Sequence, residues 1–485
     1  MFKLKNLFIF PALSFSIFAT AQGTFASNKY TSGNDNFTNV KESFSENKSL
    51  AKDEVESEIN KMMSDPVLRN ANWGFVVYDP ITQKIVTSYN ETTPLVPAST
   101  TKLLTTDTAF GLVGENFKWK TQLEYKGDIS EDGTLTGNLY IVGSGDPSLG
   151  TRKAGAASYT EIVSDYIRSI ADAGIKKIKG DIIIQTAVFK VNKSPVLPEN
   201  IVWVEDNNYY LPVGTTLDIN PRNEKLVVPA KNPFKETERY FYVSPYAHKM
   251  VFASAFDGKN YLSTTLPEAP SYLATLLKNS LNKSKLPISG SVINIKIQLK
   301  AENREVLYTY ESPTLMDIVH YTNQHSDNGL AEAILRMVGF QKFGDQSLSS
   351  GKEAVISHLT NINFDLKGLN YIDGSGLSHS NTVTPIAQAK FLASRMKENY
   401  FKDYFESLPI AGQSGTLRRM FVNSDANGQI FAKTGTLNKV KALAGYIKTK
   451  TGRTLTFSLL VNNYAGSVAQ VKQKMELLLT PTLEL

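Results

Sequence analysis

The sequence predicts an α+β protein: a five-stranded antiparallel sheet flanked by helices, with a large β-rich insertion. Two strand-like segments lie near the N-terminal end and three near the C-terminal end, so pairing between the two ends would complete one sheet. Between them, residues 116–304 alternate short strands with turns rich in Gly, Asp and Asn. A length of 485 residues exceeds one ordinary core, and an apolar content of 41% excludes a wholly disordered chain.

Composition excludes several classes of protein. The chain has no cysteine, so a disulfide framework, a thiol nucleophile and a Cys-ligated metal site are impossible. Its five histidines form no His-Glu-x-x-His pattern, and His320 and His325 are wrongly spaced to share one helical face. We therefore expect no metal and no other cofactor. A net charge of +6 over the whole chain is too small to indicate a nucleic-acid partner.

The N-terminus has the order of a secretory signal peptide. Lys3 and Lys5 precede a mostly apolar run over 7–19, and Ala19-Thr20-Ala21 fits a small-x-small cleavage site. The run is too short for a typical membrane-spanning helix, although an uncleaved anchor is the alternative. We predict a signal peptide over 1–21 and a flexible polar leader over 22–50. The mature protein is then exported, to the periplasm or outside the cell, with at most peripheral membrane association.

The outer segments, residues 51–115 and 305–485, are predicted to form one α+β domain. Val55, Ile59 and Met62 recur at helical spacing, and a Pro-containing turn separates the first two strands. In order, these segments predict a helix over 53–63, strands over 73–78 and 84–89, helices over 98–110, 314–323 and 329–340, strands over 429–432, 442–448 and 454–462, and a helix over 467–479. The insertion over 116–304 predicts strands over 121–125, 138–142 and 181–184 and a helix over 159–171, as one or two domains.

The first chemical motif is Ser99-Thr-Thr-Lys102, at the start of the predicted helix over 98–110. A serine and a lysine three residues apart on a helix share one face. The lysine can activate the serine if its ammonium is deprotonated, which burial and a nearby cation favour. Ser99 at a helix N-terminus would also present its backbone N–H to an oxyanion. Other serines with Lys at the third position following lack this strand–strand–helix setting: Ser45, Ser49, Ser280, Ser349 and Ser394.

The second motif is Ser326-Asp-Asn328, between two predicted helices. Its hydroxyl and amide can relay a proton and hold a substrate amide, and a simpler role as the N-cap of the helix that follows is compatible with this. The third motif is Lys433-Thr-Gly435, which follows a predicted strand and continues through Thr436. Gly435 at a strand edge lets a substrate backbone come close, and Lys433 can hold a carboxylate.

A rival to the third motif is Lys450-Thr-Gly452. It sits between two apolar strands and is typical of a hairpin turn. We therefore favour the motif that begins at Lys433.

Together, Ser-x-x-Lys, Ser-Asp-Asn and Lys-Thr-Gly resemble the signature of penicillin-binding proteins and class A β-lactamases. The long stretch between the first two motifs resembles the D-alanyl-D-alanine carboxypeptidase/endopeptidase group, class C type 4, which carries inserted domains there. The runs 145–149, 180–183, 373–378, 409–412 and 415–417, with Asn381 and Pro385, also resemble that group. The resemblance implies a penicillin-binding, transpeptidase-like catalytic domain with a β-rich insertion.

The resemblance also implies roles for individual residues. Ser99 is the acylated nucleophile, Lys102 is its base, and Ser326 and Asn328 complete the proton relay and contact the substrate amide. Lys433 and Thr434 bind the terminal carboxylate, and the backbone N–H groups of Ser99 and Thr436 form the oxyanion hole. The expected reaction is acyl transfer from D-Ala-D-X ends of peptidoglycan stem peptides, as carboxypeptidase, endopeptidase or both. β-Lactams would acylate the same serine as inhibitors.

One residue departs from the pattern of the group. After the run 373–378 the group often has an arginine that can contact the side chain of the stem peptide, and here the position is His379. Histidine binds a carboxylate less reliably near neutral pH. Asp146 is a second candidate for that pocket, and a turn residue before Pro147 is the simpler interpretation.

Three other functions compete with this reading. A serine β-lactamase is the nearest, but the Glu-x-x-Leu-Asn run that drives deacylation in class A enzymes is missing from the sequence. A non-catalytic peptidoglycan-binding scaffold would keep the fold, but the complete set of motif residues argues against it. A Ser-His-Asp hydrolase is disfavoured because the sequence has no Gly-x-Ser-x-Gly run.

Overall fold

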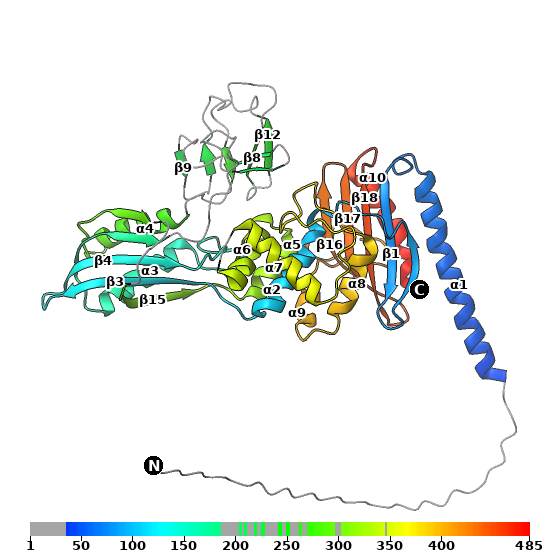
Figure 1. Cartoon of the computed structure of the whole chain (residues 1–485), viewed down its shortest axis with the longest axis horizontal. Helices are drawn as coiled ribbons and strands as arrows, with labels where there is room; N and C mark the ends of the chain where they lie inside the picture. The colour runs from blue at the N-terminus through cyan, green and yellow to red at the C-terminus, as the bar shows by residue number, and fades with distance from the viewer. Residues whose placement is uncertain are drawn as a thin grey trace, which may run out of the picture. The chain divides into compact units, whose positions relative to one another are not determined.

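The computed structural model describes residues 35–185, 269–295, 302–344 and 347–485, together with seven short strands between 203 and 263. The predicted signal peptide over 1–21 lies outside these residues. Figure 1 shows the course of the chain and the labels used below.

One five-stranded antiparallel sheet, in the order β16-β17-β18-β1-β2, joins the two ends of the chain. Its strands are β1 (Asn72–Asp79), β2 (Lys84–Tyr89), β16 (Ile430–Leu437), β17 (Val440–Lys448) and β18 (Thr454–Asn462). The central pair β1 and β18 is antiparallel from Asn72 opposite Asn462 to Tyr78 opposite Thr456. The predicted fold class, with two strands from the N-terminal side and three from the C-terminal side, is confirmed.

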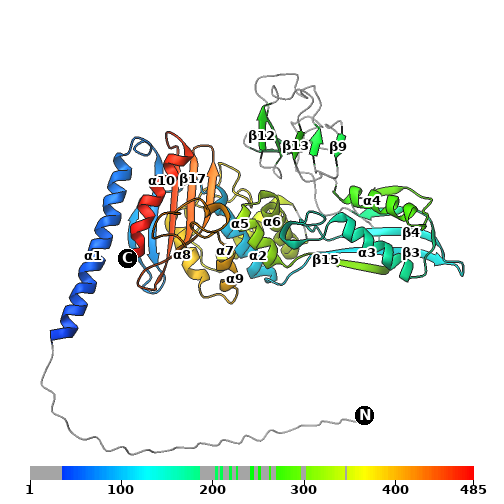
Figure 2. The ribbon, with the colours of Figure 1, turned by 180° about the vertical axis from the view of Figure 1, so that it is seen from behind.

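Helices cover both faces of this sheet (Figures 1 and 2). Side chains alternate along β17, so that Ala444 and Tyr446 join the cluster formed with the helices α2, α5, α6, α7 and α8, whereas Leu443 and Ile447 join the cluster formed with α10. We call the first of these, formed with α2, α5, α6, α7 and α8, the helix-side cluster, and the second, formed with α10, the α10-side cluster. The helices are α2 (Lys102–Val113), α5 (Leu315–His325), α6 (Asn328–Phe343), α7 (Leu348–Asn361), α8 (Pro385–Arg395), α9 (Phe401–Glu406) and α10 (Val468–Leu479).

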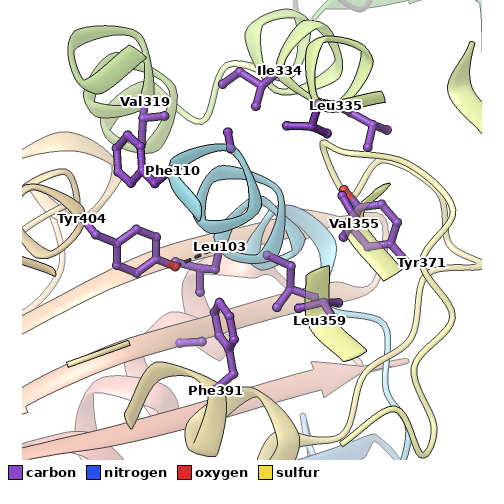
Figure 3. Packing of buried hydrophobic residues seen from close by; sticks show 14 of the residues in the cluster. Leu103, Phe110, Val319, Ile334, Leu335, Val355, Leu359, Tyr371, Phe391 and Tyr404 are labelled. Carbon is purple, nitrogen blue, oxygen red and sulfur yellow. Dashed lines mark hydrogen bonds between the residues drawn. The ribbon is translucent and has the colours of Figure 1, made fainter. Parts of the chain in front are cut away.

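Helix α2 runs through the middle of the helix-side cluster (Figure 3). Leu103 and Phe110 pack among side chains from the neighbouring helices, and the Tyr404 hydroxyl donates a hydrogen bond to the Leu103 carbonyl at 3.0 Å. Its threonines are buried as well, and Thr106 and Thr108 satisfy their hydroxyls on carbonyls one turn earlier. Because α2 is buried from Lys102 to Phe110, packing holds this part of the helix rigidly and fixes the residues at its start.

The insertion has a sheet and a core of its own. The sheet contains β3 (Lys120–Ile129), β4 (Thr134–Gly143), β5 (Lys177–Lys179), β6 (Ile182–Gln185), β14 (Val292–Ile295) and β15 (Glu305–Glu311). Helices α3 (Tyr159–Asp172) and α4 (Ala269–Lys283) pack against it through apolar side chains. Strand β15 follows the predicted end of the insertion at residue 304, but it pairs antiparallel with β3 and so belongs to the inserted sheet.

Seven further short strands lie in the insertion. They form a four-stranded group in the order β12-β11-β8-β7 and a three-stranded group in the order β13-β10-β9. Their bounds are β7 (Trp203–Glu205), β8 (Asn208–Tyr210), β9 (Asp218–Asn220), β10 (Lys225–Val227), β11 (Phe241–Ser244), β12 (Lys249–Phe252) and β13 (Tyr261–Ser263).

Helix α1 (Asp35–Ser64) begins inside the segment that composition predicts to be a flexible leader. Asn, Ser, Glu and Lys tolerate a solvated helix, and a polar composition alone does not distinguish such a helix from coil. From Ala51 onward, side chains at helical spacing (Val55, Ile59 and Met62) are buried in the α10-side cluster. Among the described residues, no helix combines the length and the apolar character that a membrane span needs.

Candidate active site

Ser99 and Lys102 lie where the chain enters α2. The short 3₁₀ turn η1 (Ala98–Thr101) begins with Ala98 in the left-handed region at φ 46° and leads directly into α2. Lys102 Nζ donates a hydrogen bond to Ser99 Oγ at 3.0 Å. Ser99 is half-buried, whereas Lys102 is completely buried, so the serine alone of the pair can meet a substrate.

Lys102 connects the first motif to the second. Its Nζ also donates to Asn328 Oδ1 at 2.7 Å and to the Ser375 carbonyl at 2.6 Å. Burial lowers the pKa of Lys102 to about 8, and the charges of Glu332, Asp373 and Asp327 act in the opposite direction. A lysine in this range holds a useful neutral fraction near physiological pH and can accept the proton of Ser99.

Ser326 occupies the turn between α5 and α6 and connects the second motif to the third. It adopts the left-handed conformation, φ 56° and ψ 40°, and its Oγ accepts a hydrogen bond from Lys433 Nζ at 2.8 Å. Asp327 caps α6 by accepting from the Leu330 N–H at 2.9 Å, and also pairs with Lys153 at 2.6 Å. Lys153 belongs to the inserted region, so the insertion contacts the Ser-Asp-Asn turn directly through this ion pair.

The third motif lies on β16, at the edge of the sheet. Lys433 is fully buried, and burial together with the charges of Lys102 and Lys441 lowers its pKa well below the usual range. Gly435 passes so close to η1 that an added Cβ would stand 2.6 Å from the Pro97 carbonyl oxygen. This close passage brings the edge of β16 to the entrance of α2, where Ser99 lies.

Thr434 and Thr436 have different surroundings on β16. Thr434 is buried and its hydroxyl donates to Thr416 Oγ1 at 2.7 Å, whereas Thr436 is exposed and accepts from Lys441 Nζ at 2.7 Å. The rival motif lies in the β17–β18 hairpin turn, and there Lys450 pairs with Asp425 at 2.8 Å and with Glu484. The expected hairpin turn at 450–452 is therefore confirmed.

The three motifs do not include two acidic residues, Glu332 and Asp373, that hold the loop whose Ser375 carbonyl accepts a hydrogen bond from Lys102. Glu332 accepts from the backbone N–H of Ser375 at 2.8 Å and of Gly374 at 3.3 Å. Asp373 is buried and accepts from three further backbone N–H groups, those of Gly376, Leu377 and Ser378. Burial and the neighbouring Asp373 raise the pKa of Glu332 to about 7. The sequence does contain a signal for Glu332: it lies four residues after Asn328, and therefore on the same face of α6.

Asp146 and His379, the two candidates for the side-chain pocket, have different surroundings. Asp146 Oδ1 accepts from the Ser148 N–H at 2.8 Å and from its hydroxyl at 2.6 Å, which is the expected turn role. Its Oδ2 is buried and lacks a hydrogen-bond partner in the described part of the chain, and burial raises the pKa of Asp146 to about 6. His379 is exposed and directly follows the loop that Asp373 holds.

A half-buried serine beside a desolvated lysine, next to the edge of a helix-flanked antiparallel sheet, has the arrangement of a penicillin-binding type of serine acyltransferase. Within the described ranges, His, Asp and Glu side chains form no cluster suited to a metal ion. The sequence pattern of the D-Ala-D-Ala carboxypeptidase 3 (S13) family matches residues 55–233 and 257–481. The chain belongs to this family and is a serine peptidase.

Relatives of known description extend over most of the chain. A D-alanyl-D-alanine carboxypeptidase of Actinomadura sp. (strain R39) is 27% identical over 459 residues, which cover 85% of this chain and 82% of the relative. D-alanyl-D-alanine carboxypeptidase DacB of Haemophilus influenzae is 27% identical over 443 residues, 83% of this chain and 88% of the relative. The crystal structure of penicillin binding protein 4 from Haemophilus influenzae has the same fold, with a TM-score of 0.65, 24% identity, and coverage of 86% and 97%.

Proposed function

We propose that the mature protein is an exported DD-peptidase that trims peptidoglycan stem peptides through an acyl-enzyme at Ser99. The observation that carries the proposal is the fully buried Lys102, whose Nζ donates to Ser99 Oγ and to Asn328 Oδ1. The two curated relatives are both described as D-alanyl-D-alanine carboxypeptidases, which supports this substrate class. Export would place the enzyme in the periplasm or outside the cell, where peptidoglycan is found.

In the acylation step, neutral Lys102 takes the proton of Ser99 while Oγ attacks the carbonyl carbon of the penultimate D-Ala. The backbone N–H groups of Ser99 and Thr436 stabilise the oxyanion. Collapse of the tetrahedral species breaks the C–N bond, and the leaving amine needs one proton. Lys433 donates to Ser326 Oγ, which leaves the Ser326 hydroxyl proton available for that amine. The ammonium of Lys102 returns the proton it took from Ser99 to Ser326, so Lys102 is neutral again before deacylation. Water then attacks the acyl-enzyme, with Lys102 again as base.

The substrate would bind as an extra strand along the edge of β16. Backbone pairing at a sheet edge gives affinity without requiring a particular side chain. The terminal carboxylate would then meet Lys433 and Thr434. Binding of this anion favours the ammonium form of Lys433, whose pKa is lowered by burial and by the charges of Lys102 and Lys441.

The test is the intact mass of residues 22–485 after incubation with a penicillin, beside the variant Ser99→Ala. A stable gain of one drug mass that disappears in the variant is the expected result, because β-lactams acylate the serine that attacks the peptide. A transient adduct with consumption of the drug would instead indicate a serine β-lactamase. If a folded sample forms no adduct and consumes no drug, the proposal fails, and a non-catalytic scaffold is the remaining interpretation.

Asp146 is expected to select the side chain of the stem peptide. Its buried Oδ2 lacks a partner among the described residues and suits a cationic amine, whereas His379 offers less to a carboxylate than the arginine of the group. Asp146→Asn should lower kcat/KM about tenfold for a peptide with a free amine on its third residue. The same peptide with that amine acetylated is the control and should not distinguish the variant from the wild type. Equal loss on both peptides would show that Asp146 acts only as a turn residue.

A further inference from the structure

Lys441 is a buried lysine directly behind the third motif. It stands opposite Thr436 in the β16–β17 pairing and is 2% exposed. Its Nζ donates to Thr436 Oγ1 at 2.7 Å. Thr436 itself is exposed at the edge strand, so a hydrogen bond connects a buried cation to a hydroxyl that a ligand can reach.

The surroundings of Lys441 supply cations rather than a countercharge. The charges acting nearby are Lys472 on α10 and Lys433 on β16, and within the described residues Lys441 has no carboxylate in an ion pair with it. Its apolar neighbours on the same face of β17 belong to the α10-side cluster. Burial and Lys472 lower the pKa of Lys441 to about 7. A buried cation without a countercharge is costly, and an anion bound nearby would offset that cost.

The hydrogen bond from Lys441 also orients Thr436. A threonine hydroxyl has two acceptor positions and one proton to donate. Because the ammonium of Lys441 occupies an acceptor position, the hydroxyl proton of Thr436 remains for a ligand on the exposed side. Lys433 acts in the same way on Ser326, from the opposite face of β16.

We infer that Lys441 is a positioning residue that directs the Thr436 hydroxyl, and its own positive charge, toward the carboxylate of the substrate. The inference rests on the proposed function and specifies how that function recognises a free carboxylate. Binding of the anion stabilises the ammonium form of Lys441, so a proton is taken up on binding. The contribution is therefore largest below pH 7 and declines as Lys441 becomes neutral above it.

The test compares acylation of Ser99 by benzylpenicillin and by its methyl ester, which lacks the carboxylate charge. In Lys441→Met, the second-order rate for the free acid should fall about tenfold, because a charge-assisted contact is lost. The concentration that gives half the limiting rate should rise while the limiting rate stays unchanged. The rate for the ester should change less than about twofold. The loss on the free acid should be greatest at pH 6 and small at pH 8.5 or above.

Two further variants make the result specific. Thr436→Val should show the same selective loss, and adding Lys441→Met to it should cause no additional loss, because both act through one hydrogen bond. Lys472→Met removes a neighbouring charge without touching Thr436 and should show no selective loss. If Lys441→Met does not fold, Thr436→Val alone still decides the point, since a loss confined to the free acid is required.

Equal losses on the acid and the ester would overturn the inference and assign Lys441 a purely structural role. Unchanged rates on both compounds would overturn it as well. Failure of the proposed function is a separate result: the wild-type protein would then form no adduct at saturating drug.

Discussion

Replacement of Lys102 by methionine is expected to lower the rate of Ser99 acylation by about 10³- to 10⁴-fold. Lys102 is completely buried and donates to Ser99 Oγ, and the proposed mechanism makes its neutral form the base in acylation. Methionine has a similar length and no proton-accepting nitrogen. The measurement is the time course of the penicillin adduct by intact mass, with far-UV circular dichroism to establish that the variant is folded.

The fold should survive this change, because removing a desolvated ammonium offsets much of the loss of its three hydrogen bonds. A fall of less than tenfold in a folded variant would contradict the assignment and would require a different base.

Lys102 should also determine the acid limb of the pH profile of the rate of Ser99 acylation. Acylation requires neutral Lys102, so the rate should rise with pH and level off above the pKa of about 8. Among the neighbouring charges that raise the pKa of Lys102, that of Glu332 has the largest effect. Glu332→Gln should therefore move the acid limb to lower pH, because loss of the negative charge destabilises the ammonium form. A purely structural effect would lower the rate at every pH without moving the limb.

The second large effect is expected for Gly376→Ala, a change that adds one methyl group. Gly376 has φ 79°, and an added Cβ would stand 1.9 Å from the Ala98 carbonyl oxygen, immediately before Ser99. Backbone must shift to relieve that contact, since neither partner is a flexible side chain. We expect destabilisation of about 3 kcal/mol or more and a loss of acylation, because strain and overpacking add.

Gly452→Ala is the matched control for this prediction. Gly452 has nearly the same φ, 80°, but an added Cβ meets nothing within 4 Å. It should cost about 1 kcal/mol from the left-handed backbone alone and leave acylation unchanged. Denaturant unfolding and the penicillin adduct measure both effects. Equal destabilisation by the two alanines would show that the loop around Gly376 yields without disturbing Ser99.

Periodicity and turn residues were sufficient to predict several elements of the fold. The strands over 73–78 and 454–462 and the helix over 159–171 agree with β1, β18 and α3 within a few residues. These segments have strong local patterns, so residues that are neighbours along the chain are enough to predict their secondary structure. Polar composition misled at α1, which is helical from Asp35, because a solvated helix and a coil share the same residue types.

The sequence by itself determined the three motifs and the choice between two Lys-Thr-Gly runs, since both depend on short spacing and local setting. Only the tertiary structure decided which groups act on the motif lysines. Ser375 and Glu332 meet beneath Lys102, Lys153 reaches Asp327 from the inserted region, and Lys441 stands behind Thr436. Most of these contacts join residues far apart in the chain, and burial shifts the pKa values of Lys102, Glu332 and Lys441. Burial and the resulting pKa shifts come from the packing of whole elements, which no local pattern encodes.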